Sequence, residues 1–264
     1  MSKQVAALER ALDQPLFRRT TRALALTDAG ERLLPEARAA VATFDRALSA
    51  VAGRDPLAVR LRVSAPPNLA LARLMPMLAA FQRRWPTVAL DLRLADARVD
   101  LARDGIDLAV RVGALGGARG RRVGTARRIC VAAPGYLARA GTPAAPADLA
   151  AHSCLTYALL EAGSVWAFAG GEQVTVTGPF SANDPGALRL AAVAGLGVAL
   201  SATWLFEDDL AAGRLRHLLP DHQPLEMPIH LVTRAGPPSP ALTLLADHLA
   251  DAIGADPSLA VAQG

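Results

Sequence analysis

Residues 16–30 read LFRRTTRALALTDAG, and this stretch is the most specific part of the sequence. Its first half, residues 16–22, is rich in arginine and threonine, and residues 24–26 then alternate as Leu-Ala-Leu. Thr27 follows with the short hydroxyl side chain of a helix N-cap. The stretch predicts a hairpin-like wing with a basic tip, joined to a capped helix. Arginine and threonine at such a tip suit contacts with phosphate groups, which position a protein on DNA.

On the N-terminal side of the wing, the sequence predicts the end of an amphipathic helix. Val5, Leu8 and Leu12 recur at spacings of three and four residues, and Pro15 ends the pattern. Residues 1–22 hold five basic and two acidic residues, so +3 of the formal net charge of +4 lies there. This concentration is typical of a region that meets a polyanion, although charge alone favours a simple solvated helix.

On the C-terminal side, a long helix is expected from Asp28 to about Val51. Its apolar residues follow the 4, 3, 4, 3, 4 spacing of a heptad repeat: Leu33, Ala37, Ala40, Phe44, Ala47 and Val51. Such a seam pairs with a second helix in a coiled coil or packs against its own domain, and both interpretations stay open. Gly53-Arg54-Asp55-Pro56 ends the helix and is the clearest linker in the chain.

Beyond the linker, strands and helices alternate. Strands are predicted at residues 59–63, 88–94, 106–112, 129–133, 155–157 and 229–233, with one more that ends at Leu200. Helices are predicted before Trp85, at 99–104, after Asn183-Asp184-Pro185 and at 241–253, and a hairpin turn at Gly170-Gly171. This order indicates βαβ units and mostly parallel sheets, in which ligands bind at the carboxyl ends of the strands.

The composition describes a folded globular protein of about two domains. The chain has 264 residues, of which 52% are hydrophobic and 20% charged. Its two cysteines, Cys130 and Cys154, are too few for a disulfide framework, which fits a reducing cytoplasm. The start of the chain lacks the apolar stretch of an export signal. The longest uncharged run, residues 190–206, has 17 residues, fewer than the ~20 that span a bilayer, so no membrane partner is expected.

Several charged side chains are interpreted as ordinary structural features. The five histidines lack the spacing of metal ligands, so neither a metal site nor a cofactor is expected. Asp96, Asp100, Asp104 and Asp107 recur at helical spacing and are interpreted as a solvated helix face. The arginines of residues 111–128 are interpreted as a solvated loop. No nucleophile elbow or phosphate-binding loop accompanies these residues, so an enzyme is not expected.

Taken together, these features resemble the LysR-type transcriptional regulators. In that family a recognition helix, a wing and a linker helix follow one another. The corresponding motifs here are Ser2-Lys3-Gln4 with Ala7-Leu8-Glu9, then residues 16–22, then residues 26–30. The resemblance continues through the family's effector domain, at residues 61–64, 104–113, 133–137 and 194–200. Because the motifs stand in the family's order and extend to Ile253, the resemblance covers nearly the whole chain.

The resemblance implies an α/β fold: a two-lobed effector domain like a periplasmic binding protein, with doubly wound, Rossmann-like lobes, preceded by a linker helix and a partial winged helix-turn-helix. The implied domains are a remnant of the DNA-binding domain (1–27), a linker and dimerisation helix (28–55), effector lobe I (56–133 and 234–254), effector lobe II (134–233) and a loose tail (255–264). Roughly thirty residues of the family's head would precede Met1, so DNA binding by this chain is expected to be impaired.

The resemblance also implies two sets of site residues. DNA contacts are expected from the recognition helix, the wing and the start of the linker helix: Ser2, Lys3, Gln4, Arg18, Arg19, Thr20, Arg22 and Thr27. Effector contacts are expected in the interlobe cleft: Ser64, Pro66, Val112, Gly113, Asn183 and Ser201. The resemblance implies a small and anionic effector, because the family binds small metabolites, often carboxylates, in this cleft. The residues fit this expectation: the Ser64 hydroxyl can hold a carboxylate, and the helix after Asn183 has an N-terminus that attracts anions. Simple helix capping is the alternative for both residues.

The implied function is that of a cytoplasmic bacterial transcription regulator that binds double-stranded DNA and a small effector. It would form a homodimer through residues 28–51, and pairing of effector domains would extend the dimer to a tetramer. Effector binding would change the relative orientation of the effector domains and so the spacing of the DNA-binding ends. A stand-alone solute-binding protein of the two-lobe receptor type is the alternative, and the wing argues against it.

Overall fold

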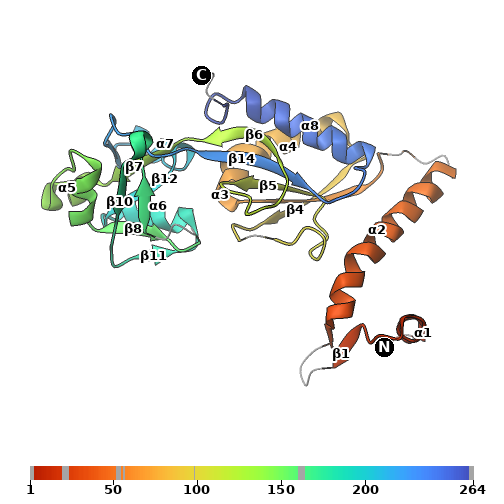
Figure 1. Ribbon diagram of the computed structural model, residues 1–264. Coiled ribbons are helices and arrows are strands. Elements are labelled where there is room, and N and C mark those ends of the chain that lie inside the picture. The colour runs from red at the N-terminus through yellow and green to blue at the C-terminus, as the bar shows by residue number, and fades with distance from the viewer. Residues whose placement is uncertain are drawn as a thin grey trace.

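The computed structural model consists of two neighbouring lobes and a long helix that leads away from them (Figure 1). It describes residues 3–19, 24–51, 55, 57–97, 99–159 and 164–261. The N-terminal part comprises helix α1 (Lys3–Leu12), the antiparallel strands β1 (Phe17–Arg19) and β2 (Leu24–Leu26), and helix α2 (Asp28–Val51). The wing and the long helix predicted from the sequence are therefore present, although the tip of the wing lies outside the described residues.

Local hydrogen bonds join α1, the hairpin and α2 into one unit. The Glu9 carboxylate accepts a hydrogen bond from the backbone N–H of Leu16 at 2.7 Å. The Thr27 hydroxyl accepts one from the N–H of Gly30 at 3.1 Å and donates one to the Pro15 carbonyl at 2.6 Å, so Thr27 caps α2 as predicted. A Cβ atom on Gly30 would lie 2.2 Å from the Leu16 carbonyl oxygen, so this close approach requires glycine.

Lobe I is built on a five-stranded mixed sheet. Its strands are β3 (Arg60–Ala65), β4 (Ala89–Leu94), β5 (Leu108–Val112), β6 (Arg121–Ala126) and β14 (Met227–Thr233). The order across the sheet is β4-β3-β5-β14-β6. The first three strands are parallel, whereas β14 runs antiparallel to both β5 and β6. The prediction of a mostly parallel sheet is therefore correct for one half of the sheet and wrong for the other.

Lobe II repeats this arrangement. Its strands are β7 (Arg128–Ala132), β8 (Cys154–Tyr157), β11 (Ser181–Ala182), β12 (Val198–Ala202) and β13 (Arg216–Leu218). They are ordered β11-β8-β12-β7-β13, with the first three parallel and the last two antiparallel to their neighbours. A separate hairpin of β9 (Val165–Ala167) and β10 (Gln173–Thr175) turns through Ala169–Gly171, which confirms the predicted turn.

Helices cover the sheets of both lobes. In lobe I they are α3 (Pro67–Leu69), a π-helical turn (Ala70–Leu74), α4 (Met75–Arg84) and α8 (Pro240–Ala255). In lobe II they are α5 (Pro134–Ala140), α6 (Pro185–Val193) and α7 (Glu207–Ala211), with 3₁₀ turns at Pro146–Ala151 and Thr203–Leu205. Asp184 and Ser239 cap α6 and α8, and in both helices proline takes the first helical position. No helix in the described part of the chain is long and apolar enough to cross a membrane.

Each lobe has its own apolar core. In lobe I, Phe81 of α4 and Leu245 of α8 are fully buried in the core, and in lobe II Leu155 of β8 and Phe206 are fully buried in the same way. Trp204 is different, because it belongs to the chain of lobe II while its side chain packs in the core of lobe I. Trp204 is 8% exposed, so it forms a large buried contact between the two lobes at their junction.

The strand pairing places both lobe boundaries several residues nearer the N-terminus than the sequence predicts. Strand β7, expected within lobe I (56–133), pairs with β12 and β13 of lobe II. Strand β14, expected within lobe II (134–233), pairs with β5 and β6 of lobe I. The chain therefore crosses between the lobes near Arg127 and returns near Glu226. A strand belongs to the sheet in which its hydrogen-bonded neighbours lie. The sequence does not show which strands will pair, so it does not fix these boundaries.

Three further segments differ from the predictions. Residues 99–104 form turns and not a helix, and the arginine-rich residues 111–128 contain β6 and not a continuous loop. The expected loose tail is packed up to residue 261: Leu259 is fully buried in the lobe I core, and its carbonyl accepts a hydrogen bond from Thr125 N–H at 2.7 Å. Residues 262–264 lie outside the described residues.

Candidate functional site

A cavity of about 1360 Å³ lies between the two lobes. It is lined from both sheets by residues at the carboxyl ends of strands: Pro66 after β3, Val112 and Gly113 at the end of β5, Tyr157 at the end of β8 and Ser201 on β12. In each sheet the first of the three parallel strands, β3 or β8, is flanked on both sides by later parallel strands, so the strand order reverses there. The crevice outside the carboxyl ends at such a reversal is where open α/β sheets bind ligands.

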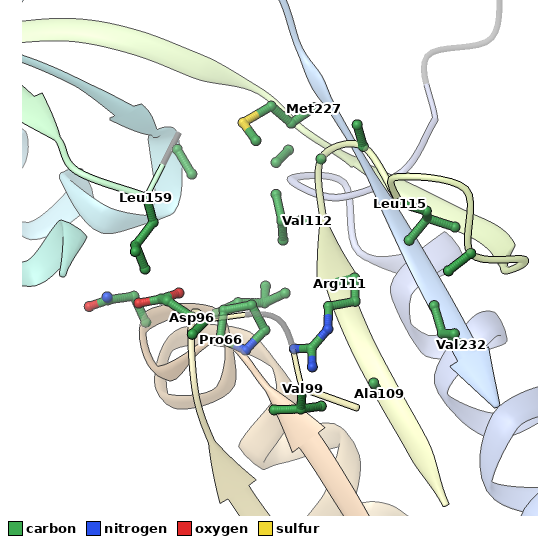
Figure 2. A pocket seen from close by; sticks show the side chains of 18 of the residues that line it. Pro66, Asp96, Val99, Ala109, Arg111, Val112, Leu115, Leu159, Met227 and Val232 are labelled. Atoms are coloured by element: carbon green, nitrogen blue, oxygen red, sulfur yellow. The ribbon is translucent and has the colours of Figure 1, made fainter. Parts of the chain in front are cut away.

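Arg111 supplies a positive charge on the lobe I wall of this cavity. It comes from β5, and its guanidinium lies between Pro66 and Val99 (Figure 2). The Nη2 atom donates a hydrogen bond to Ser64 Oγ at 3.4 Å. No carboxylate oxygen of the described residues lies within 4.0 Å of this guanidinium. Burial lowers the pKa of Arg111, while the charge of Asp96 opposes this shift; an arginine nevertheless stays protonated, so it keeps its positive charge in the cavity wall.

Asp96 supplies a negative charge on the same wall. It follows β4, and its side chain extends into the cavity beside Pro66 (Figure 2). The carboxylate has no hydrogen bond or ion pair with any described residue, and Arg98 lies outside the described part. Burial, and then the charge of Asp184 in lobe II, raise the pKa of Asp96 to about 6, while Arg111 opposes the rise. Asp96 is therefore a half-buried acid that faces a second acid across the cleft.

Lobe II contributes Tyr157 and Arg128 to the cavity. Burial raises the pKa of Tyr157, and the charges of Asp96 and Asp184 raise it further, so the hydroxyl stays protonated and able to donate. Arg128 stands at the start of β7, where its Nε atom donates to the Leu225 carbonyl at 2.6 Å. Burial lowers the pKa of Arg128 as well. Its guanidinium makes no ion pair with the described residues and adds a second uncompensated cation.

Two polar contacts connect the lobes around the cavity. Asn68 of α3 donates through Nδ2 to Asp184 Oδ2 at 3.1 Å, so the cap of α6 is also a contact between lobes. Arg73, in the π-helical turn of lobe I, donates through Nη2 to both carboxylate oxygens of Glu207 on α7 at 2.6 Å. Arg73 also meets Ser258 of the C-terminal segment at 3.0 Å. These contacts hold the lobes at the separation seen in this structure.

Only some of the six predicted effector residues line the cavity. Four of them line the cavity: Pro66, Val112, Gly113 and Ser201. Ser64 is fully buried and makes its side-chain contact with Arg111; it does not cap α3, so the capping alternative is wrong for Ser64. Asn183 is exposed and is not one of the lining residues. Its neighbour Asp184 accepts the capping hydrogen bond of α6, from Ala187 N–H at 2.8 Å, so capping by Asn183 is wrong too.

The polar groups of the cavity were not recognised from the sequence. The interpretation of Asp96 as part of a solvated helix face is wrong, because the chain after β4 turns into the cleft without forming a helix. A signal for Arg111 does exist, since a single arginine interrupts the apolar run 108–112 and charges are rarely buried without a partner. Nothing in the sequence marks Tyr157. Among the described residues, no group of three His, Cys, Asp or Glu side chains is placed to hold a metal ion.

The predicted DNA-binding residues lie in the N-terminal unit. Three of them fall outside the described residues: Ser2, Thr20 and Arg22. Gln4 on α1 and Arg18 on β1 are exposed, while of Lys3 and Arg19 only the backbone is described. The hydroxyl of Thr27 is occupied by its bonds within the unit, which gives it a capping role. The described wing therefore carries the exposed cation Arg18 on strand β1, which pairs with β2.

Two lobes around a charged cleft, joined by a long helix to a winged hairpin, define a class: ligand-responsive regulators that bind DNA. The family models agree. The LysR substrate binding domain matches residues 54–254, and the bacterial regulatory helix-turn-helix protein of the lysR family matches residues 1–31. The chain belongs to the LysR family of transcriptional regulators, which bind DNA and sense effectors.

Individual proteins similar to this chain are also transcription regulators. The chain is 34% identical over 228 residues to the probable regulator LtrA of Klebsiella pneumoniae, covering 84% of this chain and 74% of LtrA. It is 31% identical over 229 residues to CrgA of Neisseria meningitidis, covering 83% and 75%. Full-length AphB of Vibrio cholerae, a virulence activator, superposes with a TM-score of 0.66 at 28% identity, covering 94% of this chain and 87% of AphB. These relatives are transcription regulators, and none of them supports the alternative of a stand-alone solute-binding protein.

Proposed function

We propose that the chain regulates transcription in response to a small anionic effector that binds between the two lobes. The observation that carries the proposal is Arg111, a guanidinium in the cavity wall without a carboxylate partner among the described residues. Arg128 offers a second such cation from lobe II. A guanidinium donates two parallel hydrogen bonds to one carboxylate, so an effector with a carboxylate group suits this cavity. The proposal includes no catalytic step and no cofactor, and it places the protein in the cytoplasm.

Thermal unfolding in the presence of small mono- and dicarboxylates tests the effector site. A bound carboxylate is expected to raise Tm, because a ligand at one hundred times its Kd adds about 2.7 kcal/mol to the unfolding free energy. Arg111→Gln removes the charge and is expected to abolish this rise. Arg216→Gln, at an exposed position of β13, is the matched control and should behave as the unaltered protein. An equal rise in Tm for Arg111→Gln would contradict the anion site.

The proposed regulator is a homodimer that pairs through α2. Val41 and Phe44 are 61% and 62% exposed on this helix, as expected of a helix whose apolar side packs against a second helix in the dimer.

The proposed tetramer forms by pairing of effector domains. Leu71 of lobe I and Leu190 of lobe II are also exposed and lie on surfaces through which effector domains would pair. Phe44→Glu is expected to shift the sedimentation coefficient toward the monomer, and Leu190→Glu toward the dimer. Unchanged sedimentation of both variants would contradict this assembly.

DNA contacts are proposed for the wing. The salt dependence of binding to duplexes selected from a random pool measures these contacts, because each neutralised phosphate contributes about −0.9 to the slope of log K against log salt. Arg18→Ala is expected to reduce this slope by about 1 and to weaken binding to all sequences alike. Arg216→Ala, far along the chain on β13, should leave the slope unchanged. A slope that is equal for Arg18→Ala would contradict the phosphate contact.

A further inference from the structure

The cavity between the lobes contains charges of both signs that the protein does not pair with one another. Asp96 and Arg111 line the same wall, and each affects the pKa of the other. Nevertheless, their charged atoms are more than 4.0 Å apart, so they do not form an ion pair. Two opposite charges held near each other but out of contact leave room for a ligand group beside each of them.

The surroundings of Asp96 favour a positively charged ligand group. Asp184 adds a second negative charge from lobe II, and its oxygens already accept hydrogen bonds from Ala187 and Asn68. Tyr157 adds a protonated hydroxyl that can accept a hydrogen bond through its oxygen. The Asp96 carboxylate and the Tyr157 hydroxyl thus line the cavity from the two lobes, and Asp184 adds negative charge near them without lining it. An ammonium group has three N–H donors for such acceptors.

The surroundings of Arg111 favour a negatively charged ligand group. Its guanidinium is half-buried, and its protein partners are the Ser64 hydroxyl and the Val110 carbonyl, both at 3.4 Å. These long, neutral contacts do not balance its charge, whereas a carboxylate would. An anion placed here alone would leave Asp96 without a counter-charge. A cation placed at Asp96 alone would likewise leave Arg111 without a counter-charge.

Between and above these charges the wall is apolar. Val112, Leu159 and Met227 approach the cavity from the two lobes and the connection between them (Figure 2). Such a surface suits the hydrocarbon part of a ligand, because pockets for small molecules combine an apolar lining with a few polar groups that fix orientation.

We propose that the effector is amphoteric, with an ammonium group held at Asp96, a carboxylate group held at Arg111 and an apolar side chain against Val112, Leu159 and Met227. This inference rests on the proposed function, of which it specifies the effector class. An α-amino acid with an apolar side chain is the simplest molecule with these three parts. Its ammonium group also relieves the repulsion between Asp96 and Asp184, so binding favours approach of the two lobes.

Isothermal titration calorimetry with two matched sets of compounds tests the proposal. One set is leucine, isocaproate, which lacks the amino group, and isoamylamine, which lacks the carboxylate. The other is phenylalanine, hydrocinnamate and phenethylamine. Each amino acid is expected to bind at least about tenfold more tightly than either of its partial analogues, because a hydrogen bond to a charged group contributes a factor of about 10 to 100.

Two variants assign the effect to Asp96. Asp96→Asn keeps the size of the side chain and is expected to weaken binding of the amino acid by about 10- to 100-fold while changing isocaproate binding less than about twofold. Asp251→Asn removes one negative charge at an exposed position of α8 and is the control. Far-UV circular dichroism of each variant verifies that it is folded.

The outcomes are distinct. Isocaproate or hydrocinnamate that binds as tightly as its amino acid overturns the amphoteric class but leaves the anionic effector site in place. Equal weakening of all compounds by Asp96→Asn also overturns it, and so does absence of binding by both amino acids. Loss of carboxylate stabilisation in the unaltered protein would instead contradict the proposed function itself.

Discussion

At the scale of single residues, the two thiols illustrate what burial does to reactivity. Cys130 on β7 and Cys154 on β8 are both fully buried in lobe II. Burial is the main cause that raises the pKa of each thiol to about 12, so the reactive thiolate is nearly absent at neutral pH. Neither cysteine is expected to react with Ellman's reagent in the folded protein, whereas both should react in denaturant. Rapid reaction of one thiol under native conditions would contradict this assignment.

Asp96 predicts a pH dependence of stability. Its pKa in the folded protein is about 6, above the ordinary value of 3.8, so the folded state binds a proton that the unfolded state has already lost. Stability from this group is therefore present at pH 4 and is lost as the pH rises through about 6. Because the side chain is half exposed, the expected loss is only about 1 kcal/mol.

Urea unfolding at acidic and neutral pH measures this contribution. Asp96→Asn should lack it, so the variant is expected to gain stability relative to the unaltered protein as the pH rises. Asp251→Asn, the exposed control on α8, should keep the original dependence. Parallel pH profiles for the unaltered protein and Asp96→Asn would show that the carboxylate is solvated in the folded state.

At the scale of elements, the C-terminal segment after α8 is part of the lobe I core. Leu259 is fully buried, and its backbone pairs with Thr125 of β6. Leu259→Ala is expected to lower the unfolding free energy by about 2–4 kcal/mol, because it leaves a cavity in a packed core. Val261→Ala, at an exposed position two residues on, should change it by less than about 0.5 kcal/mol. Denaturant titration of both variants decides between a packed and a loose segment.

The elements that the sequence predicts well are those with local signals. The hairpin and α2 follow from an alternating Leu24–Leu26 and from the Thr27 cap, which accepts its hydrogen bond from Gly30 within the same turn. Strand β6 escapes prediction because it begins with Arg121 and Arg122, whose side chains are exposed and suggest a loop. Its second half is buried in the same core as Leu259 and Ile253, which are far away in the sequence.

At the scale of the whole molecule, the site depends on the relation between two lobes. Pro66, Val112 and Gly113 could be predicted because family motifs lie beside them. Asp96 and Tyr157 could not, because their proximity arises only when two separately folded sheets meet across the cavity. The lobe boundaries were misplaced for the same reason, since β7 and β14 are assigned by partners in other parts of the chain.

The contacts Asn68–Asp184 and Arg73–Glu207 predict how the lobe separation responds to mutation. The double variant Asn68→Ala/Glu207→Gln removes both and is expected to increase the radius of gyration measured by small-angle X-ray scattering, at a cost of about 1 kcal/mol in stability. Arg121→Gln breaks the ion pair with Asp247 inside lobe I and should leave the radius unchanged. An unchanged radius in the double variant would mean that the apolar contacts of Trp204 and its neighbour Leu205 suffice to hold the lobes together.

The position of Trp204 has an optical consequence. Of the three tryptophans, Trp85 packs against Phe81 with its ring tilted by 39° and lies under the Arg84 guanidinium in lobe I, and Trp166 is buried within lobe II. Trp204 alone both packs into the opposite lobe and lines the cavity. The wavelength and the intensity of its fluorescence emission should therefore change when a ligand binds in the cavity or the lobes move. A variant with phenylalanine at the other two positions would provide an intrinsic fluorophore that reports occupancy in real time, without any attached dye.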